Sequence, residues 1–197
     1  MGWGGVISQG MEFVDLAKQI VPLTPVAVAQ LSAITEEIHV AKNEIIIDGA
    51  KISPYIYFLK EGCCRIYYNK DEKEVVLGFA FPGEVILSLN SYIHRGAGYE
   101  TVDCLEECRL YRIHVDKLQE LYSNSLAIAN WGRRLAELET IKIEQRLIQT
   151  LFKTASEKYD DLLKQHPLLL QKVKLGYIAS YLGVSQVTLS RIRAEVR

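Results

Sequence analysis

The chain of 197 residues lacks any apolar stretch near the ~20 residues that a membrane-spanning helix needs. Its opening stretch, MGWGGVISQGMEF, has neither a basic region nor an apolar core, so we expect no secretory signal and a cytoplasmic protein. Apolar residues make up 49% of the chain and charged residues 24%, which is close to the globular average and excludes a disordered, collagen-like or purely coiled-coil chain.

Sequence motifs for catalysis are also missing. There is no Gly-rich phosphate loop, no metal-spaced cluster of His, Asp and Glu, and no nucleophile beside a base, so we do not expect an enzyme. The cysteines are Cys63, Cys64, Cys104 and Cys108. Their spacing is poor for zinc, and we interpret them as small apolar residues kept as thiols. A metal or redox-sensing role is the alternative.

The net charge of −1 hides an uneven distribution. Residues 171–197 contain five basic residues and one acidic residue, a net charge of +4, which leaves −5 for the rest of the chain. A basic C-terminal segment on an acidic body indicates contact with a polyanion.

Residues 36–113 consist of short runs of β-branched or aromatic residues, separated by residues that are typical of turns. Regularly spaced short strands predict an antiparallel barrel or sandwich rather than a βαβ sheet. A helix is expected before them, opened by Thr24-Pro25, because threonine caps helices and proline suits the first helical position.

From Val115 to His166 the apolar period becomes helical. One stripe has spacings of 3, 4, 3 and 3 and comprises Ile128, Trp131, Leu135, Leu138 and Ile141. Such a stripe packs on its own domain or meets a copy of itself. A second helix is predicted from about Arg146 to Gln165, ending before Pro167.

The segment from Val173 to Arg197 carries the most specific pattern. A short helix, Leu175–Leu182, is predicted to end at Gly183, because glycine readily adopts the left-handed conformation, and Ser185 is placed to cap the next helix. The apolar positions that would join the two helices are Ile178, Ala179, Leu182, Val184, Leu189 and Ile192. Together these offsets predict a helix-turn-helix; an ordinary corner between two helices is the alternative.

A helix-turn-helix places the start of its second helix in the major groove, where arginine pairs with guanine and glutamine with adenine. The candidate base-reading residues are Gln186, Val187, Ser190 and Arg191. The candidate contacts to the DNA backbone are Lys174, Tyr177, Ser185, Thr188 and Arg193. Solvated surface side chains are the alternative interpretation.

A β-rich segment, a long striped helix and a helix-turn-helix, in that order, resemble the cyclic-AMP-receptor-protein family, which includes the fumarate–nitrate-reduction regulators. The similarity covers about residues 20–197, and its most specific part is IASYLGVSQVTLSRIR (178–193). The segment RLIQTLFKTASEKY (146–159) is similar to the first family helix after the hinge.

The resemblance implies an α+β fold with an antiparallel β-roll of the cyclic-nucleotide-binding type in residues 1–114, a dimerisation helix in 115–145, and a helix-turn-helix domain in 146–197. It implies a homodimer on two-fold symmetric double-stranded DNA, with a hinge near Lys142–Glu144. The expected dimer contacts are Ile128, Trp131, Leu135 and Leu138. A small effector and RNA polymerase are further candidate partners, and no membrane partner is expected.

The effector pocket departs from the family. Members that bind cyclic nucleotides use a Gly-Glu pair and a later Arg followed by Ser or Thr; here these positions are Leu87-Ser88 and Gly98-Tyr99. A desolvated phosphate without a paired cation costs several kcal/mol, and Arg95 lies three residues early. We therefore expect neither a cyclic nucleotide nor a cofactor; another effector and an unliganded roll both stay open. The candidate pocket residues are Leu87, Ser88, Arg95, Gly98 and Tyr99.

Other family variants fit no better: residues 1–62 contain no cysteine for an iron–sulfur cluster, and nothing selects one histidine as a heme ligand. Many members also have Glu where this chain has Val187, and valine can contact only a thymine methyl group. We therefore expect a different DNA site. The alternative function is a ligand-sensing module whose helix-turn-helix no longer binds DNA.

Overall fold

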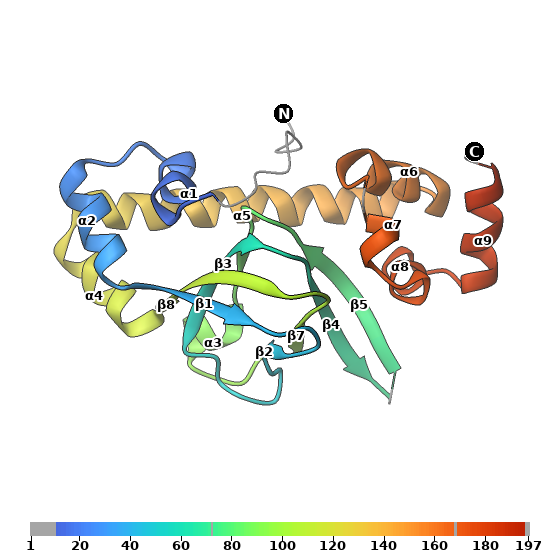
Figure 1. The fold of residues 1–197 in the computed structure, drawn as a ribbon, viewed down its shortest axis with the longest axis horizontal. Helices are drawn as coiled ribbons and strands as arrows, with labels where there is room; N and C mark the ends of the chain where they lie inside the picture. The colour runs from blue at the N-terminus through green and yellow to red at the C-terminus, as the bar shows by residue number, and fades with distance from the viewer. Residues whose placement is uncertain (1–10, 72, 168, 196–197) are drawn as a thin grey trace.

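The computed structural model describes residues 11–71, 73–167 and 169–195. Most of the stretch interpreted as lacking a secretory signal, residues 1–10, therefore lies outside the described residues. A β-roll lies beneath a long helix, and a group of short helices lies at the far end of that helix (Figure 1). The predicted fold class is confirmed.

Two four-stranded antiparallel sheets form the roll, with strand orders β1-β8-β3-β6 and β2-β7-β4-β5. The strands are β1 Thr35–Val40, β2 Ile45–Ile47, β3 Tyr55–Glu61, β4 Cys64–Lys70, β5 Lys73–Ala80, β6 Val85–Ile86, β7 Glu100–Cys104 and β8 Cys108–His114. Alternation of buried and exposed side chains, clearest in β5 and β8, turns one face of each sheet into the roll.

The helices are α1 Phe13–Ile20, α2 Pro25–Ala33, α3 Leu89–His94, α4 Val115–Asn124, α5 Leu126–Phe152, α6 Ala155–Gln165, α7 Leu169–Lys172, α8 Leu175–Leu182 and α9 Gln186–Glu195. The predicted start of α2 is confirmed. The Thr24 hydroxyl accepts a hydrogen bond from the Ala27 amide at 3.3 Å, and Pro25 occupies the first helical position.

The first half of α5 belongs to the core of its own subunit. Ile128 and Trp131 are fully buried with residues of α1, α2 and the sheet, and the Trp131 indole donates to the Ala17 carbonyl at 3.0 Å. Leu135 packs partly against the same core, and Leu138 is half-buried. The prediction that Ile128 and Trp131 contact a second subunit is therefore wrong, since side chains without exposed surface cannot meet a partner.

The long helix also extends further than expected. It ends at Phe152, so the predicted hinge at Lys142–Glu144 lies inside a helix, and the next helix begins at Ala155 rather than about Arg146. A new helix starts here because Thr154 forms a capping box with Glu157, in which each side chain accepts a hydrogen bond from the other's backbone N–H. The TASE sequence (154–157) carries this signal.

Candidate nucleic-acid interface

Helices α8 and α9 form the predicted helix-turn-helix. Gly183 ends α8 with φ 72°, and the Val184 amide bonds back to the Ala179 carbonyl at 3.0 Å. The Ser185 hydroxyl then accepts from the Thr188 amide at 3.1 Å and caps the first turn of α9. The buried side chains that join the helices are Ile178, Ala179, Leu182, Leu189 and Ile192.

The opposite side of α9 is open. All four candidate base-reading residues are exposed, and Val187 retains 64% of its surface. The Gln186 side chain lies over the start of α8, with its Nε2 atom 2.7 Å from the position that a Cβ at Gly176 would occupy. Gly176 therefore leaves room for Gln186, and most of the exposed side chains of α9 are polar.

The candidate contacts to the DNA backbone differ in their surroundings in the structure. Ser185 and Thr188 are exposed at the start of α9, and Arg193 is half-buried. Lys174 is exposed at the start of α8, with its ammonium 5.5 Å from the ring of Tyr177. Tyr177, by contrast, turns toward the roll and lies with its ring 4.0 Å from the guanidinium of Arg65 in β4. The ring of Tyr177 is thus occupied by the roll, which disfavours its predicted DNA contact.

Arg65 is the centre of the contact between the roll and the helix-turn-helix, and the sequence pattern did not single it out. It is 3% exposed and lies between the rings of Tyr67 and Tyr177, each at 4.0 Å. Its guanidinium bonds to both carboxylate oxygens of Asp103, at 3.0 and 2.7 Å, and to Glu74. Burial opposes the charge, but these carboxylates outweigh burial and raise the pKa of Arg65, so the group stays cationic.

Further polar contacts hold α8 on the edge of the roll. The Ser180 hydroxyl accepts from the Val76 amide of β5 at 3.0 Å and donates to the Glu74 carbonyl at 3.4 Å. Beside α7, Lys172 forms an ion pair with Glu106 at 2.8 Å. Residues of α7 and α8 therefore dock the helical domain on the roll.

The candidate effector residues do not form one pocket. Ser88 caps α3 and lies against Gly98, where an added Cβ would meet the Ser88 hydroxyl at 2.5 Å. Leu87 packs on the core, Arg95 forms an ion pair with Asp116 of α4, and Tyr99 is 64% exposed. Only Ser88 and Gly98 are brought together.

A carboxylate stands next to this pair. Glu100 is 8% exposed, and both its carboxylate oxygens lie 3.2 Å from the position of a Cβ on Gly98. The backbone around Gly98 is also closed by hydrogen bonds, from the Asn90 side chain to the Ala97 carbonyl and from the Ser91 hydroxyl to the Gly96 carbonyl. Where the family has an arginine for a phosphate, this chain has a glycine facing an acid.

Solved structures of other proteins share the fold of this chain. FixK2 from Bradyrhizobium japonicum has a TM-score of 0.70 at 17% identity, over 83% of this chain and 84% of that chain. The c-di-GMP responsive global regulator CLP from Xanthomonas campestris has a TM-score of 0.69 at 15% identity, over 88% and 91% of the two chains. A regulator of the Crp/Fnr family from Eubacterium rectale has a TM-score of 0.66 at 19% identity, over 90% and 87%.

The chain thus has the fold of the Crp/Fnr regulators. Within it, residues 37–125 match the family model of the cyclic nucleotide-binding domain, which covers most of the roll and α4. The fold and the domain type expected from the resemblance are confirmed. No curated protein sequence matches the chain. In the part of the chain that the structure describes, no helix is long and apolar enough to cross a membrane.

Proposed function

We propose that this protein is a homodimeric transcription regulator that reads DNA in the major groove through α9. The observation that carries the proposal is the exposed face of α9 on a correctly capped helix-turn-helix. Arg191 and Gln186 are the residues with bidentate hydrogen-bonding capacity on this face. Ser185 and Thr188 border it, and together with the exposed Lys174 at the start of α8 they are our candidates for contacts to phosphate oxygens.

The subunits of such a dimer would meet on the second half of α5. Its outer face is apolar and exposed, in contrast to the buried face that carries Trp131. The exposed side chains are Ile141 (45%), Ile143 (58%), Leu147 (56%), Ile148 (49%), Leu151 (65%) and Phe152 (78%). A patch of this kind marks an interaction site. A two-fold axis beside it would set two copies of α9 about one DNA turn, ~34 Å, apart.

The surroundings of Gly98 disfavour a cyclic nucleotide as the effector. A cyclic phosphate at Gly98 would meet the carboxylate of Glu100 and no arginine, so burial of its charge would be uncompensated. We infer that the protein works without a cyclic nucleotide or another cofactor in the roll. A different small effector and RNA polymerase remain candidate partners.

The salt dependence of DNA binding tests the proposal against the alternative of a sensing module that no longer binds DNA. A site is first selected from a randomised pool of duplexes, and its affinity is then measured at several salt concentrations. A dimer that neutralises about 6–10 phosphates should lose ~10³–10⁵ in affinity between 50 and 200 mM salt. Failure to select any site at low salt contradicts the proposal and favours the sensing module.

A further inference from the structure

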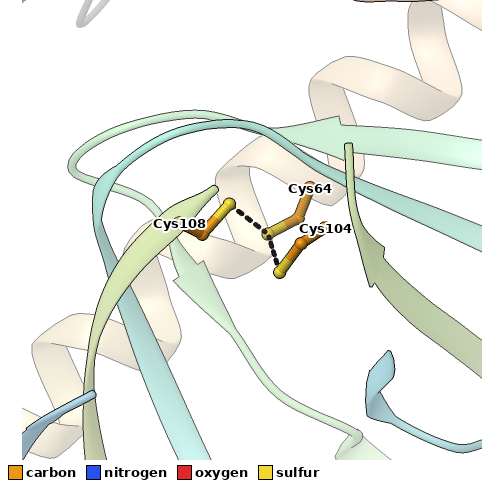
Figure 2. Close-up of side chains that lie close together, drawn as sticks. All are labelled: Cys64, Cys104 and Cys108. Carbon is orange, nitrogen blue, oxygen red and sulfur yellow. Dashed lines mark hydrogen bonds between the residues drawn. The ribbon is translucent and has the colours of Figure 1, made fainter. Parts of the chain in front are cut away.

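Three cysteine side chains converge inside the roll (Figure 2). The Cys64 Sγ atom lies 3.9 Å from the Sγ atoms of Cys104 and Cys108, and all three lie within 4.8 Å of one another. Cys64 opens β4 and pairs with Cys104 at the end of β7, while Cys108 opens β8 after a turn of three residues. Cysteines that are 40 and 44 positions apart in the sequence thus bring their sulfur atoms together in one triangle.

The sulfur triangle is sealed in an apolar environment. Its three cysteines are at most 2% exposed and belong to a core cluster with Val40, Leu59, Val102 and Leu110, among others. All four cysteines are free thiols. A three-coordinate ion with bonds of about 2.3 Å to sulfur needs its sulfurs about 3.5–4.0 Å apart. Two edges of the triangle already have this length, and the third is no longer than 4.8 Å, so an ion of this kind needs little movement of the sulfurs.

Ligand number and charge narrow the choice of ion. Sulfur ligands select soft ions, and in the described part of the chain this cluster offers three ligand atoms, one short of the tetrahedral set of structural zinc. A net charge in an apolar core costs several kcal/mol. Three thiolates leave two negative charges with Cu(I) and one with Zn(II), whereas they leave none with a trivalent ion.

We propose that Cys64, Cys104 and Cys108 form a binding site for trivalent arsenic, taken up as arsenous acid. Each thiol sulfur forms one bond to arsenic and displaces one hydroxide, which leaves as water with the thiol proton. Three S–As bonds replace three As–O bonds, three waters are released, and nothing is oxidised or reduced. Both the acid and the product are uncharged, so the core gains no charge.

The turn between Cys104 and Cys108 connects this site to the helical domain. Leu105 packs with the core of the helix-turn-helix, Glu106 pairs with Lys172, and the Leu105 amide donates to the Cys63 carbonyl at 2.8 Å. An arsenic atom bonded to Cys104 and Cys108 would link the two residues that flank this turn. Any effect of arsenic binding on DNA binding rests on the proposed function, whereas the existence of the arsenic site does not.

Native mass spectrometry of the reduced, full-length protein titrated with arsenite tests the site. We expect one adduct per chain with the mass of one arsenic less three hydrogens, together with a rise in the unfolding temperature. Cys104→Ala and Cys108→Ala should each lose the adduct. Cys63→Ala is the matched control, since Cys63 is equally buried and adjacent but outside the triangle, and it should keep the adduct.

Absence of the adduct, or its persistence in both Cys104→Ala and Cys108→Ala, would overturn the proposal. Parallel titrations with Cu(I) and Zn(II) would overturn it if either ion raised the unfolding temperature more than arsenite. If both variants fail to fold, alkylation of the wild-type protein gives the answer: arsenite should slow the reaction of the three thiols but not of Cys63, and equal effects on all four would refute the site. Because these measurements contain no DNA, a failure of DNA binding does not affect them.

Discussion

The guanidinium of Arg65 in β4 lies 4.0 Å from the ring of Tyr177 in α8, and this contact joins the roll to the helix-turn-helix. Asp103 and Glu74, both residues of the roll, hold the cation by ion pairs. The roll therefore holds a guanidinium group in place against the Tyr177 ring of α8, and α9 follows α8 after a short turn.

Tyr177→Ala should loosen the helical domain while leaving the roll intact. A cation–π contact of this kind stabilises by about 0.5–2 kcal/mol, so we expect faster hydrogen exchange in α8 and little change in β7 and β8. Tyr68→Ala, which removes an exposed tyrosine from the same strand as Arg65, is the control. Equal exchange in α8 of the wild type and Tyr177→Ala would show that the contact does not hold the domain.

Arg191→Ala should weaken binding to a selected DNA site by about 1–3 kcal/mol and relax the preference at one base pair. The reason is the loss of a bidentate contact from the exposed face of α9. Gel shifts on the selected site and on its single-base variants measure both effects. Lys42→Ala, an exposed cation on the roll, should leave affinity and preference unchanged; an unaltered preference in Arg191→Ala would remove this residue from the reading set.

Leu147→Glu should convert the proposed dimer into monomers. A charge in the middle of the outer face of α5 would have to be buried without a partner on association, which costs several kcal/mol. Light scattering across a range of protein concentrations reports the change. Val26→Glu, at another exposed apolar position (69%), should leave the mass unchanged. A Leu147→Glu protein that stays dimeric would place the interface elsewhere.

Trp131→Ala should lower the stability of the folded subunit rather than change the oligomeric state. The indole is fully buried and hydrogen-bonded to Ala17, so its removal leaves a cavity and costs about 3–5 kcal/mol of unfolding free energy. Denaturant unfolding measures the loss, which should not depend on protein concentration once dimerisation is blocked by Leu147→Glu. A loss of unfolding free energy below about 1 kcal/mol would contradict the placement of Trp131 in the core.

His166 should make stability pH-dependent. Its ring stacks on Phe81 with centroids 3.5 Å apart, and burial lowers its pKa below the ordinary value of 6.5. The unfolded chain then takes up a proton that the folded protein does not, so stability falls as the pH drops through about 6.5 toward the lower folded pKa. His166→Gln should flatten the unfolding free energy in that interval, and an unchanged slope would exclude this histidine as its source.

The local features of the fold could be predicted from particular residues. Thr24-Pro25, Gly183 and Ser185 act within one helical turn, so their spacing in the sequence is their spacing in space. The apolar positions of α8 and α9 follow for the same reason, and so does the exposed face that contains Arg191. The capping box of Thr154 and Glu157 is equally local. Its sequence signal indicates that α6 starts at Ala155, which excludes both the start at about Arg146 and the hinge at Lys142–Glu144.

The features that the sequence left open depend on contacts between distant segments. The stripe of α5 has a helical period whichever neighbour it meets, and only the docking of α1 and α2 decides that Trp131 is inside and Leu147 outside. Arg65 becomes an interdomain contact only when a helix more than 100 residues later reaches β4. The sulfur triangle likewise needs β4 and β7 paired in register and the first residue of β8, from the other sheet, packed against them. Local hydrogen bonding and hydrophobic periodicity thus determined the elements and the reading helix, whereas packing across the chain decided which faces are buried and which side chains meet.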